Sequence, residues 1–325
     1  KNLNNPFWVT FYSYKGGVGR TLTLVNVASR LCKMGKKVLL IDFDLEAPGL
    51  NEFPEFSGIN NKKGVLELLN TIENQQEVKM EDYIFNCQLQ DTFGEMLVLH
   101  SGDHQESEYQ NLLNNKDLLV QFTQKQNSTT STITRFKEIV NEQKPDYVFV
   151  DSRTGLTEVG GICTCELADL NVMVCAFNDQ NIKGIARVKK AILEYKKENG
   201  ENAKFYYIFS PRPDIILKAD KDSEPQGETI KPNYELKKAQ SILERIEKRT
   251  DLAKQKLDIE KDQFIEIPYD PIATLGEKVF SIFDVKKEMF TAHSLVAEKI
   301  ILHNDSLKEK YLTVLRNAVL HSKNF

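Results

Sequence analysis

A chain of 325 residues, of which 41% are hydrophobic and 28% charged, is long enough to bury a full core in one large α/β domain or two small ones. Its formal net charge of −4 gives no overall attraction for nucleic acid or anionic lipid, although a local basic face is left open. Five cysteines without framework spacing, no run as long as a membrane span and no recognisable signal peptide favour a cytoplasmic protein.

The first predicted elements are a strand at residues 7–11 and a helix at residues 22–31, with a glycine-rich turn between them. The turn contains Gly16, Gly17, Val18 and Gly19. Glycines let successive backbone N–H groups converge on phosphate oxygens, and the N-terminus of the following helix adds partial positive charge. We therefore predict a phosphate site that extends from this turn to Leu22.

Two positions depart from the P-loop pattern G-x-x-x-x-G-K-[ST], since Tyr14 replaces its first glycine and Arg20 replaces its lysine. Arginine can still hold phosphate, through two parallel hydrogen bonds and without losing its proton. Thr21 stands where a hydroxyl ligates Mg²⁺ in this pattern. The alternative interpretation is a tight glycine turn that binds no ligand.

The next strand is predicted at residues 38–41, a continuous apolar run typical of a strand buried on both faces of a parallel sheet. Asp42 and Asp44 leave its carboxyl end, the edge at which open α/β sheets bind ligands. One carboxylate there can orient an attacking water and another can support Mg²⁺. The alternative is a solvated acidic turn closed by Pro48 and Gly49.

Residues 52–145 carry weaker signals. We expect helices at residues 64–69, 114–122 and 134–143, a strand at residues 96–99, and a flexible polar connection at residues 124–131. A third strand with a clear motif, at residues 147–150, ends in Asp151. This is the Walker B arrangement, which holds a Mg²⁺-bound water near Thr21. An aspartate that merely caps a turn is the alternative, and Arg153 is left open between phosphate, a partner subunit and a surface acid.

Later in the chain we expect strands at residues 170–177, 205–209 and 264–267, and helices at residues 182–199 and 236–258. A charged segment near residues 218–232 is predicted to be a mobile loop, and residues 274–325 to be helical. The last helix, after Asn304, favours core packing or a partner contact over lipid binding, so membrane contact is not expected. The sequence starts at Lys1, which leaves open whether flanking residues or domains exist.

Taken together, the turn from Lys15 to Thr21, the D-x-D of Asp42 and Asp44, and the strand ending in Asp151 resemble the ParA/MinD family of dimeric ATPases with a deviant Walker A loop. The resemblance is to a bacterial subgroup with K-G-G-V-G-R-T. It implies that ATP and Mg²⁺ bind at the carboxyl edge of the sheet, with Thr21, Asp42 and Asp151 serving the metal.

The same resemblance implies catalytic roles for three residues. Lys15 would reach the nucleotide of the partner subunit, Asp44 would orient the hydrolytic water, and Arg20 would take the place of the P-loop lysine. Where relatives carry Thr/Ser-Pro-Pro/Ala-Gly after Walker B, this chain has Ser152-Arg153-Thr154-Gly155, a departure from the pattern.

The resemblance also suggests a place for the purine base. Related ATPases hold the base with polar residues at the end of one strand and with a proline-containing loop after the next. Arg212, Pro268 and Asp270 occupy comparable places in this sequence. A rigid proline loop without a ligand is the alternative.

We therefore predict one α/β domain over residues 1–325, with a doubly wound, mainly parallel sheet of about seven strands and helices on both faces. The predicted function is slow ATP hydrolysis in a nucleotide-dependent homodimeric switch. Its output would be an unidentified protein partner, in bacterial partition, localisation or defence. A nucleotide-binding scaffold with negligible turnover is the alternative, and binding to nucleic acid has weak support.

Overall fold

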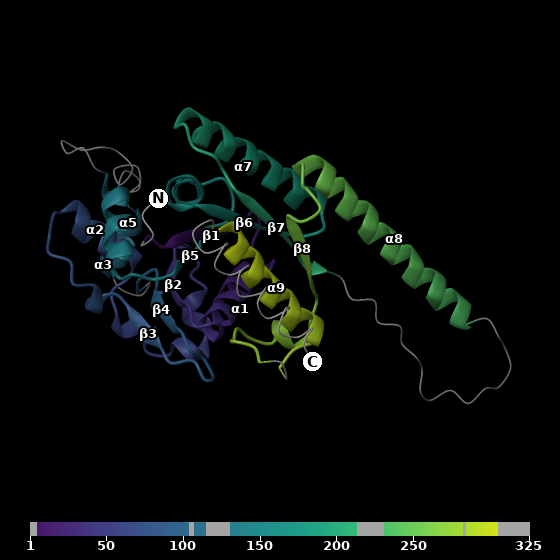
Figure 1. Ribbon diagram of the computed structural model, residues 1–325, viewed down its shortest axis with the longest axis horizontal. Coiled ribbons are helices and arrows are strands. Elements are labelled where there is room, and N and C mark those ends of the chain that lie inside the picture. Colours follow the sequence, from purple (N-terminus) through teal and green to yellow (C-terminus); the bar gives the residue numbers. More distant parts are fainter. Residues whose placement is uncertain (1–4, 104–106, 115–130, 213–230, 282–283, 305–325) are drawn as a thin grey trace, which may run out of the picture.

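The computed structural model describes residues 5–103, 107–114, 131–212, 231–281 and 284–304 (Figure 1). The polar connection expected at residues 124–131 lies outside these ranges except for Ser131, which caps the helix that follows. Most of the helix expected at residues 114–122 and the helix expected after Asn304 also lie outside them. The loop expected near residues 218–232 also falls outside them, apart from residues 231 and 232, which are helical.

One sheet forms the centre of the molecule, with strand order β3-β4-β2-β5-β1-β6-β7-β8 in the described residues. All neighbouring strands are parallel except β3 and β4. The strands are β1 (Phe7–Ser13), β2 (Lys37–Asp42), β3 (Phe85–Cys87), β4 (Glu95–Leu99), β5 (Tyr147–Asp151), β6 (Leu170–Cys175), β7 (Phe205–Arg212) and β8 (Phe264–Pro268).

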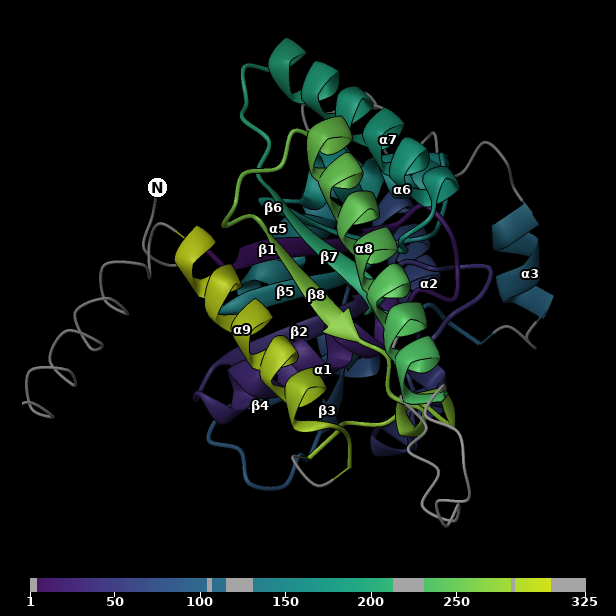
Figure 2. The same cartoon turned by 90° about the vertical axis from the view of Figure 1, so that its right-hand side faces the viewer.

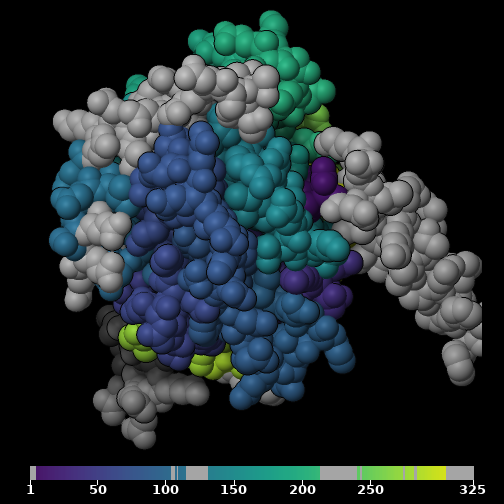
Figure 3. Space-filling model, turned by 90° about the vertical axis from the view of Figure 1, so that its left-hand side faces the viewer, coloured from purple at the N-terminus to yellow at the C-terminus, as the bar shows by residue number. Residues whose placement is uncertain are grey.

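The mainly parallel sheet predicted from the sequence is confirmed, with one addition. The antiparallel edge strand β3 was not predicted, because three residues are too few to show a period of two. Figure 3 shows this edge of the molecule, where the blue residues that follow β2 form a continuous surface.

Helices cover both faces of the sheet (Figures 1 and 2). They are α1 (Arg20–Lys33), α2 (Val65–Glu73), α3 (Ser107–Asn114), α5 (Thr132–Glu142), α6 (Glu158–Gly161), α7 (Asp179–Glu198), α8 (Lys231–Leu257) and α9 (Lys287–His303). The helices predicted at residues 64–69, 134–143, 182–199 and 236–258 are therefore confirmed as α2, α5, α7 and α8. None of the described helices is both long and apolar enough to cross a bilayer.

Alternation along the buried strands distributes the core between the two faces. Leu40 of β2 packs with α1 and α9 in one cluster, while its neighbours Leu39 and Ile41 pack with α2 and α5 on the other face. Tyr207 and Phe209 of β7 extend that second face toward α7 and α8. The continuous apolar runs are thus explained by burial on both faces.

Helix α9 packs on α1 through two buried polar side chains. The guanidinium of Arg30 lies 3.8 Å from the ring centroid of Phe290 and donates one hydrogen bond to the carbonyl of Phe280. In the part of the chain that the structure describes, its Nε and Nη1 have no hydrogen-bond partner, and neither do the two ring nitrogens of His293, which is fully buried. Burial, and then the charge of Arg30, lower the pKa of His293 to about 3. The α1–α9 contact therefore requires a neutral imidazole.

The pH dependence of stability tests this contact. Because the folded pKa of His293 is depressed, its contribution is complete above the unfolded pKa of about 6.5 and is lost as the pH falls toward 3. Between pH 6 and pH 4 we expect the free energy of unfolding to fall more steeply than in His293→Leu, by up to about 1.4 kcal/mol per pH unit. Urea unfolding followed by circular dichroism measures this free energy at each pH. The same pH dependence in His293→Leu and in the unsubstituted protein would show that His293 is not a buried neutral imidazole.

Candidate functional site

A cavity of about 670 Å³ opens at the carboxyl edge of the sheet. Strands β2, β5 and β1 lie side by side, with Asp151 in register with both Asp42 and Phe11. Their carboxyl ends therefore meet at one edge. Most of the cavity lining comes from residues 16–22 and from residues at or just after the carboxyl ends of β2, β5, β7 and β8.

The turn between β1 and α1 has the backbone shape of an anion site. Gly17 and Gly19 are left-handed, with φ of 73° and 76°, and Gly19 is the N-cap of α1. A Cβ added to Gly16 or Gly17 would meet no atom within 4 Å, so open space lies beside this part of the turn. Left-handed residues next to a helix N-terminus form a concavity that favours negative charge.

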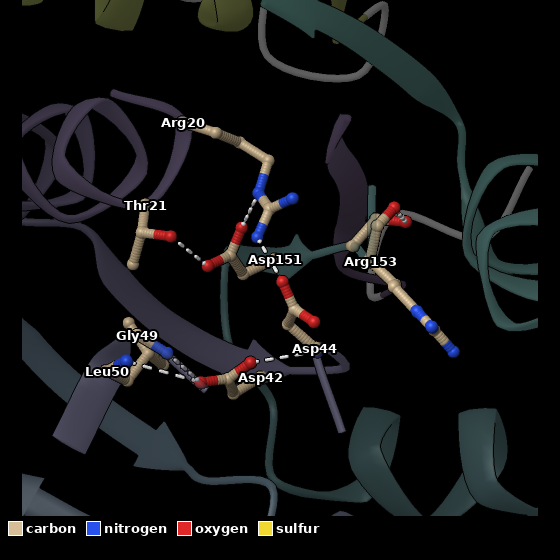
Figure 4. Close-up of polar contacts among 9 residues, drawn as sticks. Arg20, Thr21, Asp42, Asp44, Gly49, Leu50, Asp151 and Arg153 are labelled. Atoms are coloured by element: carbon tan, nitrogen blue, oxygen red, sulfur yellow. Dashed lines mark hydrogen bonds and ion pairs between the residues drawn. The ribbon is translucent and has the colours of Figure 1, made fainter. Parts of the chain in front are cut away.

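Arg20 lies between two acidic side chains beneath the turn (Figure 4). Its Nη2 donates to Asp44 at 2.9 Å and its Nε donates to Asp151. The guanidinium is nearly fully buried. Burial alone would lower its pKa, but the charge of Asp151 and the contacts with Asp44 outweigh burial, so the pKa of Arg20 is raised. Arg20 thus carries its charge at every physiological pH.

Thr21 and Asp151 form a second polar contact at the same place. The Thr21 hydroxyl donates to Asp151 at 2.6 Å. Gly49 approaches Thr21 closely, since a Cβ on Gly49 would lie 2.9 Å from the Thr21 methyl group. Thr21 lines the cavity, whereas Asp151 is fully buried behind it.

Asp42 lies deeper and organises the chain that follows β2. Its carboxylate accepts N–H bonds from Asp44 at 2.9 Å and from Gly49 and Leu50 at 3.2 Å each (Figure 4). Burial, and then the charge of Asp151, raise the pKa of Asp42 to about 8. Asp42 is therefore a buried support for the segment that carries Asp44, and it does not line the cavity.

The cavity fits a phosphate group bound with Mg²⁺. Ser13 and Arg20 line the cavity, and among the described residues Ser13 Oγ and Arg20 Nη1 are buried atoms without a hydrogen-bond partner. Both atoms can donate to phosphate oxygens. The described residues hold no group of three His, Cys, Asp or Glu side chains that could bind a metal alone. Mg²⁺ is usually held by one or two protein oxygens together with phosphates, which Thr21 and Asp151 suit.

The other predicted site residues are divided between the cavity and the surface. Val18, Leu22 and Pro268 line the cavity, whereas Lys15 is exposed and lies outside its lining. Asp270 lines the cavity too, but its carboxylate oxygens accept the N–H groups of residues 272 and 286 at 2.8 and 2.6 Å. The Asp270 side chain therefore connects its own loop to the residue that precedes α9.

Arg212 is not brought to the cavity. Its side chain is about half exposed and lies 3.8 Å from Glu266. Pairing between β7 and β8 is irregular from Phe209 to Arg212, so the simple alternation of the strand does not extend to its end. The sequence suggested that Arg212 lies beside the purine base, and the structure instead places it near Glu266.

Sequence reasoning missed several lining residues. Ser13 ends β1 directly before the turn, a position that the strand pattern could have identified. Met289 comes from α9, far away in the sequence, and no motif marks it. Glu46 forms an ion pair with Arg153, which points away from Arg20 (Figure 4). Of the roles left open for Arg153, the pairing with an acid is the one present here.

Comparisons with known proteins agree with this geometry. The AAA_31 family model, described as an AAA domain, matches residues 8–205. An uncharacterized ATP-binding protein of Methanocaldococcus jannaschii is 37% identical over 82 residues, 25% of this chain and 28% of that protein. The chromosome-partitioning ATPase Soj of Thermus thermophilus is 36% identical over 61 residues, 19% of this chain and 23% of Soj. The matches thus span about a quarter of the length of these curated relatives.

Solved structures share the fold over most of the chain. The septum site-determining protein MinD from Pyrococcus horikoshii, complexed with Mg-ADP, aligns with a TM-score of 0.56 at 16% identity, over 91% of this chain and 96% of that one. Apo McdA from Cyanothece aligns with a TM-score of 0.61 at 14% identity, over 90% and 98%. Since the family model covers more than half of the sequence, the chain belongs to the AAA_31 family, and it has the fold of the ParA/MinD type of P-loop ATPases.

Proposed function

We propose that this chain binds ATP with Mg²⁺ in the cavity, hydrolyses it slowly, and uses the bound nucleotide to control pairing with a second copy. The observation that carries the proposal is the contact of Arg20 with Asp44 and Asp151 directly beneath a glycine turn. A cation, two carboxylates and a helix N-terminus at one cavity suit a charged phosphate chain and its metal.

The turn and Arg20 are proposed to hold the phosphates. The backbone at residues 16–19 supplies N–H groups, and Arg20 Nη1 and Ser13 Oγ are donors still without a partner. Thr21, with Asp151 behind it and Asp42 supporting the edge, would hold Mg²⁺, which when bound neutralises charge on the phosphates.

Asp44 and Lys15 are proposed to act in hydrolysis. Asp44 lines the cavity on the segment after β2, where a carboxylate can orient a water molecule. Lys15 is exposed outside the lining, which supports a role at the nucleotide of a second copy. Pro268 and the loop around Asp270 are proposed to lie beside the base.

The alternative is a scaffold that binds nucleotide with negligible turnover, and one observation favours it. Arg20 donates to Asp44, the residue proposed to orient the water. If this contact persists with nucleotide bound, the carboxylate is not free to activate water. Two of the proteins named above are described as a chromosome-partitioning ATPase and as a septum site-determining protein. A role in partition, localisation or defence, through an unidentified protein partner, is therefore part of the proposal.

Substitution of the two proposed catalytic residues separates binding from hydrolysis. We expect Lys15→Ala and Asp44→Asn to lower ATP turnover by about 10²-fold or more, because the first removes the cation proposed to reach the nucleotide and the second removes the carboxylate proposed to orient the water. The dissociation constant for ATP should change by less than about threefold, since the turn is intact. Phosphate release and binding of a fluorescent ATP analogue measure the two effects.

Lys190→Ala, which removes an exposed lysine of α7, is the matched control and should behave as the unsubstituted protein. Full turnover in Asp44→Asn would exclude the proposed mechanism. An unsubstituted protein that binds ATP tightly without releasing phosphate would establish the scaffold instead.

Arg20 is tested by two substitutions. Arg20→Ala leaves two buried carboxylates without their cation, so we expect the free energy of unfolding to fall by about 3–5 kcal/mol. Arg20→Lys keeps the charge and loses the planar fork, and a smaller loss is expected. Urea unfolding in the absence of nucleotide measures both. An Arg20→Ala protein as stable as the unsubstituted one would contradict the assigned contact.

Nucleotide-dependent pairing is tested by mass measurement in solution. With ATP and Mg²⁺ we expect the mass of the Asp44→Asn protein to double, because it retains uncleaved nucleotide, and we expect a single-copy mass with ADP. A mass that is the same in both nucleotides would exclude the switch.

A further inference from the structure

Tyr14 directly follows β1, just before the glycine turn, and stands where the P-loop pattern has its first glycine. Its ring lies directly against the backbone of Gly184 in α7. A Cβ added to Gly184 would lie 2.5 Å from Tyr14 Cδ2 and closer still to Cγ and Cδ1. These atoms form the base of the ring, next to the main chain, so a methyl group at position 184 would push the ring of Tyr14 out of its present place.

The surface that receives this ring is rigid. Helix α7 begins at a capped end, where Asn178 Oδ1 accepts the N–H of Asn181 at 3.0 Å, and Ile182 and Ile185 are buried in the core beside Gly184. Glycine in a helix interior is less favourable than alanine. Gly184 therefore makes α7 less stable than an alanine would, at the position where a side chain would clash with the ring of Tyr14.

A second tyrosine fixes the same stretch of chain. Tyr12 lies two residues earlier, near the end of β1, and Tyr14 packs against the same hydrophobic cluster that contains Tyr12. Tyr12 is buried, and its hydroxyl donates at 2.8 Å to the carbonyl of Gly155, in the segment that follows Asp151. The chain that enters the turn is thus attached both to α7 and to the segment after β5.

Residues 15–17, which follow Tyr14, have no such contacts with the described part of the chain. Gly16 and Gly17 have open space where a side chain would be. Lys15, between Tyr14 and these glycines, is exposed, and within the described residues its ammonium has no hydrogen bond or ion pair. The direction in which Lys15 leaves the turn is therefore set by its backbone, and the nearest fixed point of that backbone is Tyr14.

We propose that Tyr14 is a positioning residue, whose ring seated on Gly184 fixes the turn so that Lys15 points away from the cavity of its own chain. The inference rests on the proposed function, in which Lys15 acts on the nucleotide of a second copy. In this arrangement α7 sets the geometry of Lys15 without contacting the nucleotide.

The test uses the full chain with Gly184→Ala, Tyr14→Ala, Tyr14→Phe and the double variant Tyr14→Ala/Gly184→Ala. The first readout needs no nucleotide: the rate at which endoproteinase Lys-C cleaves after Lys15, with the site assigned by mass spectrometry. The second readout compares the dissociation constant of a fluorescent ATP analogue with the rate of phosphate release.

Gly184→Ala and Tyr14→Ala should each raise the cleavage rate after Lys15 and lower turnover by about tenfold or more, with the dissociation constant changed by less than about threefold. Tyr14→Phe keeps the ring and should match the unsubstituted protein. Adding Gly184→Ala to Tyr14→Ala should change nothing further, because the new methyl group has no ring to meet. Gly276→Ala adds the same methyl group where no atom lies within 4 Å and is the control.

Three outcomes would overturn the proposal. The first is a Gly184→Ala protein whose cleavage rate and turnover are unchanged. The second is an equal loss of affinity and turnover in Gly184→Ala or Tyr14→Ala, and the third is a double variant in which the two losses add up. The last two outcomes would indicate general damage to the fold. If the unsubstituted protein neither binds nor hydrolyses ATP, the proposed function fails on its own. The cleavage rates still decide whether the ring holds the turn.

Discussion

A single buried cation connects the three segments that form the cavity. Arg20 begins α1, whereas its partners Asp44 and Asp151 follow β2 and end β5. Charges removed from water are tolerated where they are paired, and separating such a pair costs several kcal/mol. The start of α1 is therefore held against the carboxyl edge of the sheet by electrostatics as well as by the apolar packing of its buried face.

The charges of this cluster also favour binding of a further cation. Arg20 supplies one positive charge beside the carboxyl groups of Asp42, Asp44 and Asp151. The raised pKa of Asp42 reflects this imbalance together with burial. A divalent metal that arrives with phosphates would relieve the repulsion between the carboxylates, which explains why acidic residues can lie so close to an anion site.

The parts of this arrangement that the sequence predicted are those whose chemistry is local. The glycine turn, the strand before Asp42 and the strand before Asp151 are each marked by an apolar run next to a short motif. Parallel pairing of the strands then brings these motifs together at one edge of the sheet. Met289 could not be predicted in this way, because only tertiary packing brings α9 to the cavity. Arg212 was predicted to lie at the cavity from its place at a strand end, but the pairing of that strand end is irregular and the side chain lies near Glu266 instead.

The contribution of α9 to the cavity has a consequence for ligand affinity. The helix that carries Met289 packs on α1 through apolar residues and through Arg30 and His293. Within the described residues, two nitrogens of Arg30 and both ring nitrogens of His293 lack hydrogen-bond partners. Such an interface releases more readily than an apolar one of equal area, because water satisfies those atoms on opening. By thermodynamic reciprocity, a molecule that binds more tightly when α9 is packed on α1 stabilises that packing, and a change that releases α9 weakens the binding of that molecule by the same factor.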